Sequence, residues 1–200
     1  MITESEKDMK KVLLVGDSIR KGYCNYVRAK LEGECEVYFD DENCRFGEYI
    51  LRYLHGWCSS LGLTEDVDLV HFNTGLWDVL EMFGDEPLTT PDYYRNVLVR
   101  IVKRIKMLFP KAKIIFALTT SVDESQMKPE FFRRNSVIKE YNAIAVEALM
   151  PLGVGFNDLY SLTEGCDPAC RSDGVHFNNP RGEMLTGDAV VDCIRRELSL

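Results

Sequence analysis

The sequence of 200 residues has no apolar stretch of the roughly 18–20 residues that a membrane-spanning helix needs, because charged residues interrupt every run. It also lacks an excess of positive charge, since 32 acidic residues outnumber 24 lysines and arginines and the net charge is −8. A surface of this sign gives no general attraction for phosphate backbones or anionic lipids. We therefore expect neither a nucleic-acid partner nor a membrane partner.

Cysteines are few, odd in number and scattered, at positions 24, 35, 44, 58, 166, 170 and 193. Such a set fits buried thiols in a reducing compartment better than a disulfide framework. The pair Cys166 and Cys170 has no second pair and no nearby histidine, so we expect no zinc site. The N-terminus is charged, and the apolar run of residues 12–15 is too short for a signal-peptide core, which favours a cytoplasmic protein.

The length and an apolar content of 46% fit one domain over residues 1–200, with residues 1–10 as a flexible extension. Short β-branched runs alternate with longer segments whose apolar residues recur every three or four positions, which is typical of βαβ units. The expected strands are 11–15, 36–39, 67–73, 113–118 and 154–157. The expected helices are 23–31, 46–58, 92–108, 131–149 and 180–198. This order predicts a three-layer α/β/α sandwich with a central, mostly parallel five-stranded sheet of the flavodoxin-like kind.

A serine follows the first expected strand, in the segment Gly16-Asp17-Ser18-Ile19. In open parallel sheets the binding crevice lies beyond the carboxyl ends of the strands, so this hydroxyl is expected at the crevice. Asp-Ser before a helix is also an ordinary helix cap, and the four residues alone do not separate the two roles.

Near the other end, an aspartate and a histidine share a polar loop, in Ser172-Asp173-Gly174-Val175-His176. A serine nucleophile needs a base to take its proton, and the base needs a carboxylate that orients its ring and stabilises the imidazolium. Three residues of separation in a loop allow both side chains to face one crevice. Of the other two histidines, His55 is expected on a helix surface and His71 in the core.

With Gly16-Asp17-Ser18 near the start and Asp173-x-x-His176 near the end, the chain resembles the SGNH (GDSL-like) hydrolase family over nearly its whole length. Within the family it resembles small bacterial members, mostly of unassigned substrate, that read Gly-Asp-Ser-Ile-Arg, Glu-Asn-Cys-Arg-Phe and Asn-x-Gly-Leu-Trp-Asp. The resemblance implies a serine esterase in which Ser18 is the nucleophile, His176 the base and Asp173 its partner. It implies no metal and no organic cofactor.

The resemblance also implies an oxyanion hole formed by the backbone N–H of Ser18 and two further donors. At the glycine of the family's second block this sequence has Cys44, whose N–H is the expected donor, with Gly47 as the alternative. At the asparagine of the third block stands Trp77, so the nearby Asn73 is the expected replacement donor, against a purely structural role in the strand-end turn.

Three aromatic residues, Trp77, Phe46 and Phe177, are expected to line the substrate crevice and stack on a sugar ring. Arg45 and Arg20 flank it and are candidates for binding substrate oxygens. Asp17 and Asp78 are expected to brace loops, and Asn157 with Asp158 to form a turn. By analogy with the family, the substrate is a small-molecule or carbohydrate ester, with an O-acetyl group on a carbohydrate as the leading choice.

Two alternatives stay open at this stage. The first is a catalytically weak or inactive member of the same fold that binds carbohydrate or another small ligand, because the third-block asparagine is missing. The second is a nucleotide- or flavin-binding protein, but the turn Gly16–Gly22 lacks the glycine spacing and the Gly-Lys-Ser/Thr ending of phosphate-binding loops.

Overall fold

Five parallel strands form one sheet in the order β2-β1-β3-β4-β5 in the computed structural model, which describes residues 9–200. The strands are β1 (Lys10–Val15), β2 (Cys35–Tyr38), β3 (Leu69–Phe72), β4 (Lys113–Ala117) and β5 (Gly155–Asn157). Every neighbouring pair is parallel. The expected α/β class and the five-stranded parallel sheet are therefore confirmed.

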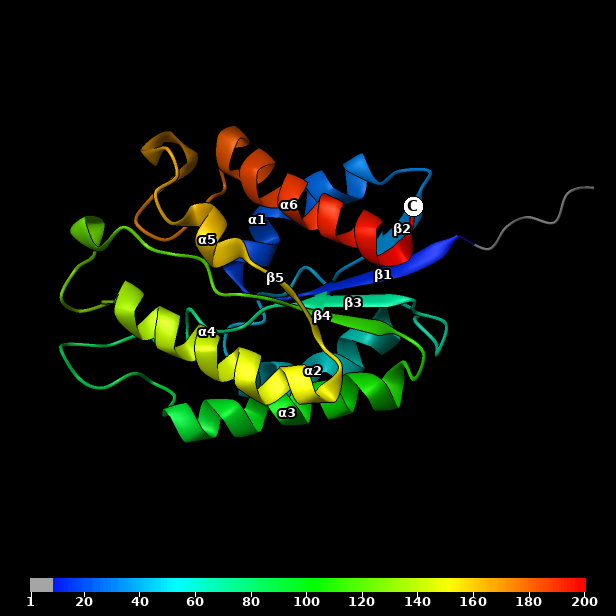
Figure 1. Cartoon of the computed structure of the whole chain (residues 1–200), viewed down its shortest axis with the longest axis horizontal. Coiled ribbons are helices and arrows are strands. Elements are labelled where there is room, and N and C mark those ends of the chain that lie inside the picture. Colours follow the sequence, from blue (N-terminus) through cyan, green and yellow to red (C-terminus); the bar gives the residue numbers. More distant parts are fainter. Residues whose placement is uncertain (1–8) are drawn as a thin grey trace, which may run out of the picture.

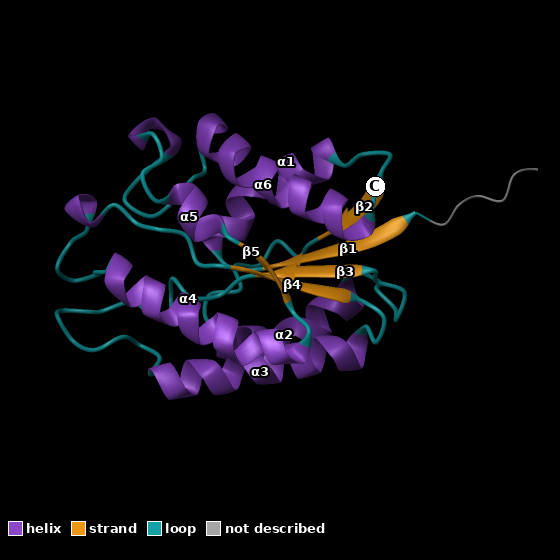
Figure 2. Ribbon diagram, viewed as in Figure 1, coloured by secondary structure: helices purple, strands orange, loops and turns teal. Residues whose placement is uncertain are grey.

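Helices cover both faces of this sheet, as the colours of Figures 1 and 2 show. One layer contains α1 (Ser18–Lys30), the short α5 (Leu159–Thr163) and α6 (Pro180–Leu198), and the other contains α2 (Gly47–Ser60), α3 (Pro91–Leu108) and α4 (Asn135–Leu149). Three short 3-10 helices, Glu124–Gln126, Met150–Leu152 and Pro168–Cys170, lie in the connections. The three-layer sandwich follows from this arrangement.

The apolar pattern explains why each element is where it is. β3 is buried along its whole length and β1 along its last four residues, because both strands have helices on each side. α3 buries residues at three- and four-residue intervals on one face and begins at Pro91, a residue preformed for the first helical turn. Within the described residues no helix is both long and apolar enough to cross a membrane.

Three expected boundaries are wrong. The proposed extension of residues 1–10 is too long, since Lys10 already belongs to β1; its residues 1–8 lie outside the described part. α1 begins at Ser18, five residues before the expected Tyr23, because Asp17 caps it. α4 begins at Asn135 and not at Phe131, because Phe132 exchanges two backbone hydrogen bonds with Glu81, of 2.8 and 2.9 Å, and this pairing holds the segment extended.

All seven cysteines are free thiols, and five of them are buried. This agrees with the expectation of buried thiols without a disulfide framework.

Arg20 is not at the crevice but inside the protein, where it is 1% exposed. Its guanidinium donates to three backbone carbonyls, those of Gly16, Asp40 and Glu42. A buried cation is tolerated because these oxygens replace water around it. Arg20 therefore joins the turn after β1 to the segment after β2, and the expectation that it binds substrate is wrong.

We predict that Arg20→Met destabilises the protein by about 2–4 kcal/mol, because buried carbonyls lose a charged donor while the side-chain volume is largely kept. Chemical denaturation measures this change. Lys21→Met is the matched control on the same helix, since Lys21 is exposed, and it should alter stability by less than about 0.5 kcal/mol. Equal effects of the two substitutions would contradict the structural role of Arg20.

Candidate active site

The turn between β1 and α1 holds Ser18 at the carboxyl edge of the sheet. Asp17 is fully buried, caps α1 by accepting from the N–H of Ile19 at 2.9 Å, and accepts from Nδ2 of Asn73 at 2.9 Å. Gly16 is required here because a Cβ at that position would lie 1.8 Å from Oδ1 of Asn73. Asp17 thus braces the turn as expected, and the position of Ser18 is set by groups from two strands.

The structure brings Ser18, His176 and Asp173 into one hydrogen-bonded series. Oγ of Ser18 lies 2.9 Å from Nε2 of His176, although the two residues are 158 apart in the sequence, and Nδ1 of His176 lies 2.7 Å from Oδ2 of Asp173. The order of the groups is that of a nucleophile, a base and an orienting carboxylate. Ser18 and His176 are half-buried, whereas the side chain of Asp173 is 55% exposed.

The loop that carries Asp173 and His176 is held by its own backbone. Oδ1 of Asp173 accepts from the N–H groups of Val175 and His176, each at 2.7 Å, and the N–H of Ser172 donates to the carbonyl of His176 at 2.9 Å. Burial acts to raise the pKa of Asp173, but the hydrogen bonds from His176 and Val175 outweigh it, and the pKa lies below its ordinary value. The carboxylate therefore stays ionised beside the imidazole.

The second-block donor expected for an oxyanion, the N–H of Cys44, is already bound elsewhere. It donates to the carbonyl of Gly16 at 3.1 Å. The expectation that Cys44 supplies a free N–H is therefore wrong, and its alternative, the N–H of Gly47 in the first turn of α2, stays a prediction. Cys44 is a buried thiol, and burial raises its pKa to about 11. By contrast, the N–H of Ser18 lies in the first turn of α1, where backbone donors have no partner in the helix.

In the third block, Asn73 is 6% exposed and uses its amide to hold Asp17, which gives it the structural role that was the alternative. Nδ2 of Asn73 carries a second N–H. That this N–H binds an oxyanion stays a prediction. Trp77 is half-buried in the turn that follows Gly75 and is available to line the crevice. Asp78 accepts from the hydroxyls of Thr74 and Thr89, at 2.8 and 3.0 Å, so it braces this turn as expected.

The candidate substrate residues differ in exposure. Phe46 is half-buried against Tyr49, and the side chain of Arg45 is 45% exposed beside Glu42, so both are available to a ligand. Phe177 is 3% exposed and lies under the guanidinium of Arg171. It belongs to the core, and the expectation that it touches substrate is wrong.

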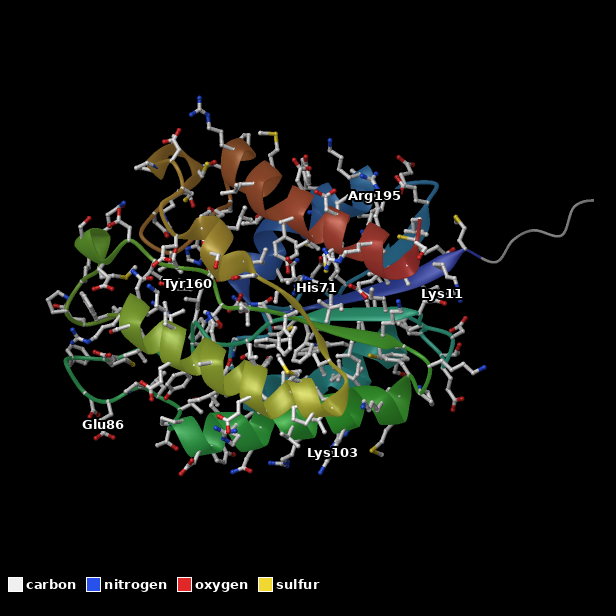
Figure 3. All side chains as sticks on the ribbon, viewed as in Figure 1. Lys11, His71, Glu86, Lys103, Tyr160 and Arg195 are labelled. Atoms are coloured by element: carbon white, nitrogen blue, oxygen red, sulfur yellow. The ribbon has the colours of Figure 1, made fainter. Side chains whose placement is uncertain are left out.

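The remaining polar residues near the sheet are structural. His71 lies near the centre of the molecule (Figure 3), and burial lowers its pKa to about 4, so it is a neutral core residue as expected. Its Nε2 lies 3.2 Å from Nδ2 of Asn157, whereas its Nδ1 has no partner among residues 9–200. Asp158 caps α5, so it lies between two elements as expected, whereas Asn157 is the last residue of β5; His55 is exposed on α2.

Sequence reasoning missed Arg133, which lies beside this site. Its Nε donates to the carbonyl of Leu76, the residue before Trp77, at 2.5 Å. Because the apolar periodicity indicated a helix from residue 131 onward, nothing in the local pattern marked Arg133 as a crevice residue. A cation shortly ahead of a helix has no sequence signature of its own.

The fold has close counterparts among solved structures, although no protein-family model and no curated protein matches the sequence. A lipase/acylhydrolase from Enterococcus faecalis has a TM-score of 0.73 at 24% identity, over 94% of this chain and 96% of that chain. A GDSL-like lipase from Bacteroides thetaiotaomicron has a TM-score of 0.72 at 17% identity, over 98% and 92%. An acetylxylan esterase from Geobacillus stearothermophilus has a TM-score of 0.69 at 18% identity, over 96% and 94%. The chain therefore has the fold of SGNH (GDSL-like) hydrolases, as its motifs predict.

The stability of the protein should depend on pH through Asp78. Burial raises the pKa of this carboxyl from 3.8 to about 6, although its hydrogen bonds act to lower it. Between about pH 4 and 6 the folded protein keeps a proton that the unfolded chain has released, so this group destabilises the fold as pH rises through that window. We predict that Asp78→Asn gains up to about 3 kcal/mol relative to the unaltered protein from pH 4 to pH 7.

The measurement is denaturant unfolding of both proteins at a series of pH values and fixed ionic strength. Only the difference between the two proteins is interpreted, because other groups titrate equally in both. A difference that is independent of pH would contradict the prediction.

Proposed function

We propose that the protein is a serine esterase that hydrolyses a small ester by way of an acyl-enzyme on Ser18. The observation that carries the proposal is the series Ser18, His176 and Asp173, with contacts of 2.9 and 2.7 Å, at the carboxyl edge of a sheet whose structural neighbours are acylhydrolases and esterases. The ionised Asp173 and the free N–H of Ser18 also support it.

In the proposed mechanism, Oγ of Ser18 attacks the ester carbonyl while Nε2 of His176 takes its proton. Asp173 keeps the ring oriented through Nδ1 and stabilises the imidazolium. His176 then gives the proton to the leaving alcohol, and the acyl group stays on Ser18. Water then attacks the acyl carbon while it gives a proton to the same nitrogen, the bond from the acyl group to Oγ breaks, and His176 returns the proton to Oγ as the acid leaves.

For the substrate we propose an O-acetyl group on a carbohydrate. One structural neighbour is described as an acetylxylan esterase, and the half-buried Trp77 and Phe46 offer aromatic faces of the kind that stack on sugar rings. The free thiols fit a reducing compartment, so a cytoplasmic location is part of the proposal.

Turnover of p-nitrophenyl acetate tests the catalytic proposal. Ser18→Ala and His176→Ala should each lower kcat by at least about 10³-fold, and Asp173→Asn by about 10²- to 10⁴-fold, because each removes one part of the proton-transfer series. The control is Ser161→Ala, which alters an exposed serine on α5.

A fluorophosphonate probe adds a readout that does not depend on the choice of ester. It should label the unaltered protein at Ser18 and leave Ser18→Ala unlabelled. If the unaltered protein is as inactive and as unlabelled as Ser18→Ala while it still binds acetylated oligosaccharide, the function is ligand binding and the esterase proposal is wrong.

The substrate class is tested by release of acetate from acetylated xylo-oligosaccharides. Trp77→Ala should raise KM for the oligosaccharide about threefold to tenfold, since one aromatic stacking contact is lost, and leave KM for p-nitrophenyl acetate unchanged. Tyr93→Ala, which removes an exposed aromatic ring on α3, is the control. Equal effects of Trp77→Ala on both substrates would count against a sugar-binding role.

A further inference from the structure

The loop between β4 and α4, residues 118–134, contacts two of the segments that form the candidate site. The N–H of Asp123 donates to the carbonyl of Gly174, next to Asp173, at 2.8 Å. At its other end, Phe132 pairs with Glu81, a few residues after the third block. The loop therefore spans from the Asp173 loop to the Trp77 turn, and Arg133 follows Phe132 directly.

Arg133 has unused donors at this place. It is half-buried, and its Nε is fixed to the carbonyl of Leu76. Its terminal nitrogens, Nη1 and Nη2, have no hydrogen-bond or ion-pair partner between Met9 and Leu200, yet they are not among the fully buried orphan atoms, so solvent reaches them. By contrast, Arg134 pairs with Glu81 at 3.0 Å, and Arg171 donates to Ser121 and Thr163.

The contacts of the loop hold Arg133 at the turn that carries Trp77, in a loop that is also bonded to the segment of Asp173 and His176. Burial lowers the pKa of Arg133, and the carboxylates of Asp17 and Asp173 act to raise it. Asp17 precedes Ser18, and Asp173 is bonded to His176. The guanidinium therefore stays protonated, and the two carboxylates that act on it adjoin Ser18 and His176.

The site has few other donors for a negative oxygen. Trp77 stands where the family has an asparagine, the N–H of Cys44 is bound to the carbonyl of Gly16, and one N–H of the Asn73 amide is bound to Asp17. Attack by Ser18 would nevertheless place a full charge on the former carbonyl oxygen, and stabilising that charge usually contributes more to such catalysis than any other single effect.

We propose that the free guanidinium N–H groups of Arg133 bind this oxyanion, in place of the missing third-block asparagine. The inference rests on the proposed function of Ser18. As the bond from Oγ of Ser18 to the carbonyl carbon forms, the π electron pair moves to the carbonyl oxygen beside Arg133, and the proton of Ser18 moves to His176. When the carbonyl reforms, the alcohol leaves with that proton. Arg133 donates hydrogen bonds throughout and loses no proton.

The test compares Arg133→Ala with Arg134→Ala, its neighbour on the same loop. The oxyanion exists only after attack, so Arg133→Ala should lower kcat for p-nitrophenyl acetate by about 10²- to 10³-fold and change KM less than about twofold. Arg134→Ala should keep kcat near that of the unaltered protein. Thermal melting shows whether each variant is folded.

Two further measurements separate a chemical role from a structural one. Guanidinium chloride at low concentration should restore part of the kcat of Arg133→Ala, and sodium chloride of the same ionic strength should not. Arg133→Lys keeps the charge but has one nitrogen in place of the separate Nε and terminal nitrogens, so it cannot keep the bond to Leu76 in the same geometry and reach the oxyanion, and it should also have reduced kcat. This second variant keeps the test available if Arg133→Ala does not fold.

Normal kcat in a folded Arg133→Ala or Arg133→Lys variant would overturn the inference, and so would a rise in KM at constant kcat, which would indicate binding of the ground-state substrate. In either case Ser18→Ala would still be inactive and the proposed function would stand. If Ser18 is neither labelled by the fluorophosphonate probe nor needed for turnover, the proposed function fails first and the inference fails with it.

Discussion

The hydrogen bond between Asn73 and the buried carboxyl of Asp17 is the contact on which the candidate site depends. It joins the turn after β1 to the end of β3, two neighbouring strands in the middle of the sheet. The same carboxyl caps α1, so the first residue of that helix, Ser18, has a fixed position relative to both strands. A buried carboxyl is stable there only because it is bonded, and the bond forms only because Gly16 leaves room for the amide.

Several polar groups of the second and third blocks likewise form hydrogen bonds that hold the loops in place. Asp78 accepts hydrogen bonds from the hydroxyls of Thr74 and Thr89, and thereby ties the turn that carries Trp77 to the segment just before α3. Each of these bonds satisfies a buried group, which makes the loops rigid, but it also removes a donor from the crevice. Under the proposed function, few donors of these blocks are left to stabilise charge at Ser18, and Arg133 is the cation that we propose in their place.

The elements of the fold were predictable because they depend on local periodicity. β1, β4 and α6 begin and end within one residue of the expected bounds, since their apolar patterns are long and uninterrupted. The start of α4 was not predictable, because the extended form of residues 131–134 depends on pairing with Glu81, which is distant in sequence. The prediction that Arg20 and Phe177 face the crevice was wrong for a similar reason. Both side chains are buried by residues from other elements, and the neighbouring sequence gives no sign of this burial.

In the candidate site, too, some residues were predictable from local sequence and others were not. Asp173 and His176 share one loop, and Ser18 follows a strand, so their chemistry is visible in short motifs. Donors for an oxyanion are different, because any backbone N–H or any cation brought near by the fold can supply the bond, and no residue type is required at a fixed spacing. A sequence can therefore lose the asparagine of the third block and keep a workable site, provided that a loop such as residues 118–134 presents a donor from elsewhere. Under our proposal Arg133 meets that condition, because its Nε is bound to Leu76 and its terminal nitrogens have no partner among residues 9–200.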